Sequence, residues 1–228
     1  MWLGAGVNES PAIWQFTGNG ASKVSTTAID NALQRFTDIE IAASFAWSYA
    51  QKGAYFVGFT VGNRSFVVDT ITGRWHTRES TIDGDQVRWR TNSITAGYGR
   101  VLVGDSADGR IGDLSVDAFT EYGTNIIRTV ATQPFSDLGD SIYLGAVELT
   151  IESGVGDVVT IDPKMRLSWS DNGKTFGNEL LRSMGKIGEY NRRVTWRRLG
   201  RIPRFRVLKF EMSDPVKPVI IKAEANIA

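Results

Sequence analysis

Apolar and polar residues alternate with a period of two along most of the chain, and glycine, asparagine and aspartate interrupt the alternation. The run Ala12-Ile13-Trp14-Gln15-Phe16 stops before Gly18-Asn19-Gly20, and Tyr55-Phe56-Val57-Gly58-Phe59 stops before Gly62-Asn63. Alternation of this kind is typical of half-buried strands, and the interrupting residues favour tight turns. The pattern predicts further strands at 65–69, 101–104, 126–132, 144–152, 165–169, 194–198, 204–212 and 218–223.

One segment has helical periodicity instead. Between residues 26 and 36, Ile29, Leu33 and Phe36 recur on one face of a helix, and Thr26 or Thr27 can cap its free amide groups. We expect a single connecting helix in a chain whose fold class is otherwise all-β.

A weak internal repeat lies in the first part of the chain. Residues 53–58 (GAYFVG) resemble residues 99–104 (GRVLVG), and a turn and a second strand follow each. This offset suits a β-propeller blade, for which periods of roughly 40–50 residues are usual. Closure takes about 4–8 blades, so the two and a fraction units seen here predict incomplete β-propeller blades.

The pattern changes near residues 134–140, where the repeat is lost and the predicted strands become longer. We therefore expect propeller-type blades over residues 1–135 and an antiparallel, β-sandwich-like domain over residues 136–228.

Composition narrows the chemistry but does not select a partner. The 228 residues include no cysteine, which excludes disulfides, thiol nucleophiles and zinc–thiolate sites. No stretch approaches the ~18 apolar residues of a membrane helix, so no membrane contact is expected. The 26 basic and 25 acidic residues give a net charge of +1.

This near-neutral total hides a basic tract. Residues 182–209 hold ten basic residues and one acidic residue, a local net of +9, whereas the rest of the chain carries 16 basic and 24 acidic residues, a net of −8. Such asymmetry is an argument about partners. The candidate subunit-facing or DNA-facing residues are Arg192, Arg193, Arg197, Arg198, Arg201, Arg204 and Arg206.

An extended strand through 204–207 is expected to bury Phe205 and Val207 and to project Arg204 and Arg206 as part of an arginine ladder. Guanidinium groups suit phosphate and carboxylate equally. The ladder can therefore meet an acidic protein surface or a nucleic acid backbone, and a solvated basic face with no partner is the third reading.

Catalytic and metal sites find little support. His76 is the only histidine, and the carboxylates of Asp83, Asp85, Asp105, Asp108 and Asp113 lie in turn contexts. The spacing of 105–113 does not match a calcium loop, and Gly4-Ala5-Gly6 lacks the third glycine of a phosphate-binding loop. We expect no catalytic residue, no cofactor, no metal and no enzymatic activity.

The segment Asp171-Asn172-Gly173 reads as a structural turn. It matches most of an Asp-box pattern, but Trp169 stands where that pattern has serine, and Asn-Gly also favours a tight hairpin. This near match motivates the alternative function, a sialidase-like or carbohydrate-binding β-propeller. A sialidase needs a convergent arginine cluster in a central pocket, and a carbohydrate module needs exposed aromatic residues, for which Trp47, Trp75 and Trp89 are available but are expected in the blade core.

Over nearly its whole length the chain resembles the packaged-DNA stabilization proteins, or tail hubs, of short-tailed bacteriophages. The motifs that carry the resemblance are WLG at 2–4, VSTTAI at 24–29, VDTITGRWH at 68–76, GDSADGRIG at 104–112, LSWSDNG at 167–173, GKIGEY at 185–190 and RRVTWRRLGR at 192–201. Family members are about twice as long, and the present chain is similar to their C-terminal part.

The resemblance implies a non-enzymatic component of the virion tail, made in the bacterial host cytoplasm. It implies a homo-oligomeric ring, hexameric in the family, that lies beneath the portal and its adaptor. With a tail needle protein the ring closes the channel and keeps the packaged DNA in the capsid, which brings possible contact with that DNA. Ring formation needs two different surface patches that meet on neighbouring copies, and we expect an acidic propeller part and the basic C-terminal part to supply them.

Overall fold

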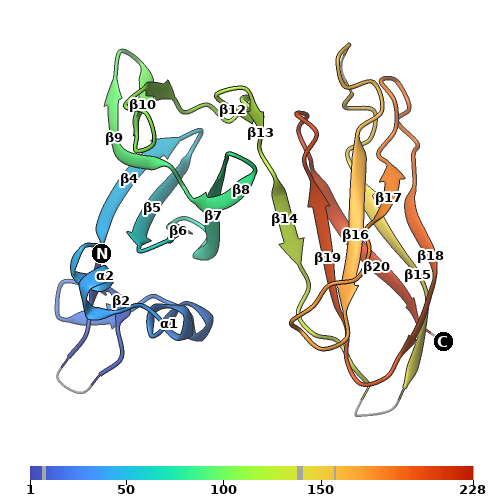
Figure 1. Cartoon of the computed structure of the whole chain (residues 1–228), viewed down its shortest axis with the longest axis horizontal. Coiled ribbons are helices and arrows are strands. Elements are labelled where there is room, and N and C mark those ends of the chain that lie inside the picture. The colour runs from blue at the N-terminus through green and yellow to red at the C-terminus, as the bar shows by residue number, and fades with distance from the viewer. Residues whose placement is uncertain (7–8, 138–140, 157, 228) are drawn as a thin grey trace. The chain divides into compact units, whose positions relative to one another are not determined.

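The computed structural model describes residues 1–6, 9–137, 141–156 and 158–227, and it divides into two compact units, Met1–Ser115 and Val116–Ala228. Strands form nearly all of the regular structure in both units (Figure 1), so the all-β prediction is confirmed. Strands such as β4 and β19 bury alternate residues, as the period-two pattern predicts, whereas β6 is buried on both faces.

The first unit holds three antiparallel sheets. The first has the order β1-β2-β3, the second β4-β5-β6-β7-β8 and the third β11-β10-β9. Their strands are β1 (Trp2–Gly4), β2 (Ala12–Phe16), β3 (Ala21–Lys23), β4 (Phe45–Gln51), β5 (Ala54–Val61), β6 (Arg64–Asp69), β7 (Arg74–Ile82), β8 (Asp85–Arg88), β9 (Thr91–Gly97), β10 (Arg100–Asp105) and β11 (Ile111–Asp113).

The internal repeat corresponds to equivalent strands. Residues 53–58 run into β5 and residues 99–104 run into β10, and each of these is the second strand of its sheet. Between the two sheets lies a core of Trp47, Tyr49, Val67, Trp89 and Val101. Successive sheets that pack through apolar residues in this way are blades of a propeller.

A cation lies inside this aromatic core. The guanidinium carbon of Arg78 is 4.8 Å from the ring centroid of Trp89, 5.2 Å from that of Tyr49 and 5.3 Å from that of Phe56. One of its nitrogens also donates to the Tyr49 hydroxyl. The faces of aromatic rings attract a cation, so these contacts offset the loss of water around Arg78. Trp47 and Trp89 are both buried, whereas Trp75 is half-buried and donates to the Val24 carbonyl.

The helix predicted over residues 26–36 is present as α1 (Thr27–Leu33), and a second helix, α2 (Asp38–Ala42), follows outside the predicted range. Helix α1 buries Ile29 and Leu33 against β5 and β6. A capping box starts α2, in which the Glu40 amide donates to the Thr37 hydroxyl and the Thr37 amide donates to the Glu40 carboxylate. This Thr-x-x-Glu spacing, just after residues 26–36, was the sequence signal for the second helix.

The second unit is a β-sandwich of two antiparallel sheets. One has the order β14-β19-β16-β17 and the other β18-β15-β20, and a separate hairpin, β12-β13, precedes them. The strands are β12 (Thr120–Glu121), β13 (Thr124–Asn125), β14 (Arg128–Ala131), β15 (Ile142–Ile151), β16 (Lys164–Ser170), β17 (Leu180–Ser183), β18 (Val194–Ile202), β19 (Val207–Met212) and β20 (Ile220–Ile227).

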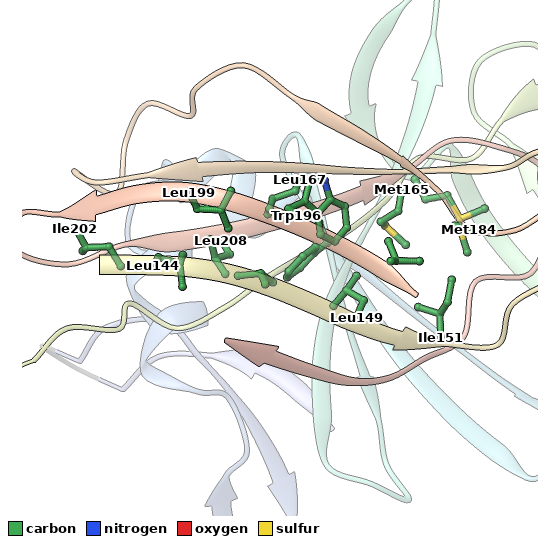
Figure 2. Close-up of a cluster of buried hydrophobic side chains, with 14 of the residues drawn as sticks. Leu144, Leu149, Ile151, Met165, Leu167, Met184, Trp196, Leu199, Ile202 and Leu208 are labelled. Carbon is green, nitrogen blue, oxygen red and sulfur yellow. The ribbon is translucent and has the colours of Figure 1, made fainter. Parts of the chain in front are cut away.

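The sandwich core consists of inward-facing residues from both sheets, with the fully buried Trp196 at its centre (Figure 2). The Trp196 indole donates to the Leu180 carbonyl over 2.7 Å, and its ring lies 5.8 Å from that of Phe210. A buried tryptophan needs such a partner for its N–H, and here the partner joins β18 to β17 at one side of the sandwich.

The boundary between the units precedes the expected one. The units divide after Ser115, not after Phe135. The reason is β14, which pairs with β19 in register Val130–Phe210 and so belongs to the sandwich. Long-range pairing of this kind leaves no mark on the local sequence pattern. Residues 138–140 of the segment that motivated the predicted boundary lie outside the described residues.

Asp105, at the end of β10, forms a buried ion pair with Arg90. Arg90 Nε donates to one carboxylate oxygen over 2.8 Å and a terminal nitrogen donates to the other. The Asp105 side chain is fully buried and that of Arg90 is 9% exposed. Burial alone raises the pKa of Asp105, but the hydrogen bonds from Arg90 and from the Ala107 amide outweigh it and lower this pKa from 3.8 to about 2.

We predict that Asp105→Asn lowers the free energy of unfolding of the first unit by about 3 kcal/mol at neutral pH, because it removes the buried carboxylate that binds Arg90. It leaves Arg90 with the half-exposed Asp108 carboxylate, 3.6 Å away. A lowered folded-state pKa stabilises the fold above pH 3.8, and this contribution disappears as the pH falls through about 2. The penalty of the variant therefore shrinks with acidification. Urea unfolding followed by tryptophan fluorescence at pH 7 and pH 3 measures it.

Asp113→Asn is the matched control. Asp113 also faces an arginine, Arg100, at 3.7 Å, but both side chains are exposed. Exposed pairs contribute between about 0 and 1 kcal/mol. Equal losses for the two variants would contradict the assignment of the stabilisation to the buried pair.

Candidate interface on the C-terminal sandwich

Strand β18 carries three of the predicted interface arginines. Val194, Trp196, Leu199 and Ile202 are buried in the sandwich core. Alternation therefore places Arg197 and Arg201 on the outer face of the sheet, where they pair in register with Ala146 and Tyr143 of β15. Both arginines are exposed, and so is Tyr143.

Arg197 and Arg201 are four positions apart, an even number, so they lie on the same face of β18, and a β-bulge lies between them. The register between β15 and β18 shifts between Leu144 and Ala146, where Arg198 and Leu199 lie opposite the single residue Gly145. Arg198 adopts a φ of 59°, which is uncommon for a residue with a side chain. The bulge turns Leu199 into the core and leaves the Arg198 side chain exposed.

The outer face of the sheet β18-β15-β20 also has a hollow of about 620 Å³. Glu148 lies in it and accepts two hydrogen bonds from Arg193, of 2.8 and 2.6 Å, which hold the pKa of this carboxyl below its usual value. Arg197, Glu224 and Asn226 line the same hollow. Of the predicted interface residues, Arg193 is therefore engaged within its own chain.

Five of the seven arginines remain open to a partner. Their side chains are exposed and take part in no hydrogen bond or ion pair with any residue in the described ranges: Arg192, Arg197, Arg198, Arg201 and Arg204. Exposed arginines that are not held in an ion pair are the groups that a docking acidic surface or phosphate can bind at least desolvation cost. Arg197 nevertheless lies near the Glu148 carboxylate and helps to lower its pKa.

Arg206 contradicts its prediction. It is 2% exposed, because the buried row of β19 is Leu208, Phe210 and Met212, and alternation extends this row inward to Arg206. Phe205 and Val207 are only half-buried, so the expected phase of the strand was off by one residue. The prediction placed the apolar Phe205 and Val207 on the core face of the strand. It was wrong because Arg206 has polar partners in the interior of the sandwich.

These partners satisfy the buried Arg206 guanidinium. Nε and one terminal nitrogen donate to Asp171 over 2.6 and 2.8 Å, and the terminal nitrogens donate to the carbonyls of Leu199 and Arg201 over 2.6 and 3.1 Å. The guanidinium carbon also lies 5.1 Å from the ring centroid of Trp169. Arg206 thus joins the β16–β17 loop to the end of β18.

The segment Asp171-Asn172-Gly173 starts a longer loop instead of a tight hairpin, since β16 ends at Ser170 and β17 begins at Leu180. Asn172 Oδ1 accepts from the amides of Lys174 and Thr175 over 2.8 and 2.9 Å. Only Gly173 of the Asn-Gly pair has a positive φ, which excludes the expected two-residue turn. Asn172 organises the loop and Asp171 binds Arg206.

The charge asymmetry lies within the second unit. Residues 1–115 hold 10 basic and 11 acidic residues, a net of −1. Residues 116–228 outside the basic tract hold 6 basic and 13 acidic residues, a net of −7. The expectation of an acidic propeller part is therefore wrong, because most of the excess acidic residues accompany the arginines in the sandwich.

The chemistry expected of an enzyme is not assembled by the predicted residues. His76 lies at an exposed position of β7, and Asp105 is committed to Arg90. Among the described residues no group of three or more metal-ligating side chains comes together. The seven arginines of the predicted interface all belong to the second unit and not to the blades. No helix in the described ranges is long and apolar enough to cross a membrane.

Sequence reasoning missed Tyr143, Glu148 and Glu224, which share the outer face with the arginines. The alternation of β15, in which Leu144, Val147 and Leu149 are buried, contained a signal for the first two. Glu224 had no such signal, because every residue of β20 is exposed.

We predict that Asp171→Ala lowers the free energy of unfolding of the sandwich by about 3 kcal/mol, because it leaves the Arg206 charge buried without its carboxylate. Arg204→Ala is the control, since Arg204 is a neighbouring but exposed arginine whose loss changes stability by about 0.5 kcal/mol or less. Thermal unfolding of the two variants beside the wild type checks the difference. A neutral Asp171→Ala would show that Arg206 finds sufficient partners in the two carbonyls.

Comparison with known proteins adds to this geometry. The model of the family described as bacteriophage P22 Gp10, beta-propeller, matches residues 1–119, and the model described as bacteriophage P22 Gp10, beta-sandwich, matches residues 127–228. These assignments agree with blades in the first unit and a sandwich in the second. The comparison with curated proteins found no match. Because the two models together cover almost all of its residues, the chain belongs to the bacteriophage P22 Gp10 family of phage structural proteins.

Proposed function

We propose that this chain is a subunit of a phage tail hub that closes the portal channel and keeps packaged DNA in the capsid. The family and the motifs quoted above support a structural role in the virion. In this proposal several copies form a ring, hexameric by family resemblance, that contacts a portal adaptor above and a tail needle within. This function involves no covalent reaction. It depends on the surface residues through which the subunits and their partners bind.

The observation that carries the proposal is the set of five exposed arginines whose side chains form no hydrogen bond or ion pair within the part of the chain that the structure describes. They lie in a tract with a net of +9 beside a remainder of the same unit with a net of −7. A head-to-tail ring needs two different patches on each subunit. We infer that the arginines of one sandwich face the acidic part of the next, and not the propeller blades.

The double variant Arg197→Glu/Arg201→Glu tests the subunit contact. Both residues lie on the outer face of β18, and reversal of their charge replaces attraction by repulsion. We expect the wild-type chain to form a ring whose mass decreases at high salt, and the variant to lack the ring at all salt concentrations. Light scattering at low and high salt measures both masses.

The control is Lys174→Glu/Lys217→Glu, which makes the same change in net charge at two exposed lysines of the same unit. It should assemble like the wild type. Ring formation by the arginine variant, or a wild-type chain that stays below ring mass under all conditions, would refute the proposed contact.

Contact with DNA is separable from contact between subunits. If the arginines meet phosphate groups, the wild-type chain binds duplex DNA with an affinity that falls steeply as salt increases. The variant Arg192→Ala/Arg204→Ala leaves the outer face of β18 intact. A loss of DNA binding in this variant with the ring retained would assign these two arginines to the genome.

A further inference from the structure

The sandwich is closed at one side and open at the other. At the closed side, β17 and β18 are joined by the hydrogen bond from Trp196 to the Leu180 carbonyl and by one of 3.1 Å from Arg182 to the Thr195 carbonyl. At the open side the two sheets end in β14 and β20. No backbone or side-chain hydrogen bond between these two edge strands is found among the described residues.

Strand β20 exposes residues that face the interior. Ala223 and Ala225 pair in register with Leu149 and Val147, each only 1% exposed, so they share the inward face of the sheet. All eight residues of β20 are nevertheless exposed, including Ile227 at 51%. Within the described ranges the opposite sheet leaves this strand exposed, and its edge strand β14 is only four residues long.

Strand β14, the edge of the opposite sheet, also exposes an inward-facing residue. Val130 of β14 pairs with the buried Phe210, yet it is 49% exposed. Between the two edges runs an apolar groove of about 370 Å³, lined by Arg128, Val130, Met165, Phe210, Met212, Pro218 and Ile220. We call this groove, together with the inward row of β20, the open seam.

The free edge of β20 has the features of a pairing strand. Alternate residues direct their N–H and C=O groups away from β15, and an edge attracts another strand unless a charge points inward or a proline or bulge blocks it. Strand β20 has a bulge at Ile221, so the uninterrupted part of its edge is residues 222–227. The two charges of β20, Lys222 and Glu224, lie 2.9 Å apart on the outer face, opposite Thr150 and Glu148. The inward row therefore stays apolar.

We propose that β20 pairs with β20 of a second copy of this chain, antiparallel and about a two-fold axis through Ala223. The strand is complementary to itself in this register. Lys222 of each copy lies opposite Glu224 of the other, and on the inward side Ala223 meets Ala223. Opposite charges on directly paired residues stabilise antiparallel strands. The pairing joins two three-stranded sheets into one and brings the two open seams together.

This pairing goes beyond the proposed function and does not depend on it. A two-fold contact uses the same patch on both copies, whereas the ring uses two different patches. The two contacts also use different strands, since the ring involves the outer face of β18 and the dimer involves the edge of β20. We expect the dimer to persist in Arg197→Glu/Arg201→Glu, which removes the ring.

A charge-swap cycle tests the register. Lys222→Glu and Glu224→Lys each place like charges opposite one another at two positions of the dimer, and either variant should weaken dimerisation by about tenfold. The double variant Lys222→Glu/Glu224→Lys restores both pairs and should recover the wild-type dissociation constant. Ala223→Lys, which sets two ammonium groups against each other on the axis, should give a monomer. Sedimentation equilibrium over a range of protein concentrations measures each constant.

Circular dichroism and thermal unfolding establish that every variant retains the sandwich, which is expected because all three positions are exposed. All of these measurements are made in the Arg197→Glu/Arg201→Glu background, where no ring contributes to the mass. A monomeric parent chain would overturn the proposal. So would single variants that dimerise as the parent does, or a double variant that fails to recover.

Discussion

The buried guanidinium of Arg206 is the interaction on which the architecture of the C-terminal unit depends. A charge can remain inside a protein only with a counter-charge and a full set of hydrogen-bond partners. Asp171 supplies the counter-charge and the carbonyls of Leu199 and Arg201 supply the rest. These partners come from the β16–β17 loop and from the end of β18, so one side chain holds two separate segments in place.

Some of the exposed arginines flank a segment that Arg206 holds. The Leu199 carbonyl that Arg206 binds lies in the bulge of β18, and Leu199 is buried in the core, while Arg197 and Arg201 lie on the outer face on either side of it. The buried arginine therefore stabilises the backbone between two exposed ones. The basic tract contains two kinds of residue, a structural cation and a set of surface cations, which composition alone does not distinguish.

The two sides of the sandwich differ for a related reason. Trp196 and Arg182 use their donors to join β18 to β17, which closes that side. The side formed by β14 and β20 has no comparable donor in the described part of the chain, and its strands differ in length. The sandwich thus has one side whose edge strands are joined by hydrogen bonds, next to the arginines. On the other side the described residues of the edge strands are not joined in this way, and apolar residues are exposed there. Both sides are suited to assembly, but through different forces.

The sequence by itself determined those features of the protein that depend on local periodicity and composition. Alternation predicted the strands, the repeat of 53–58 and 99–104 predicted equivalent blade strands, and the arginine density predicted a charged surface. Tertiary structure alone decided the boundary after Ser115, since β14 joins a strand that lies about eighty residues later in the sequence. It also decided which arginines are free. Arg204 and Arg206 are two residues apart and have the same chemistry, but only one of them meets a carboxylate from another loop, and such long-range contacts have no local signature.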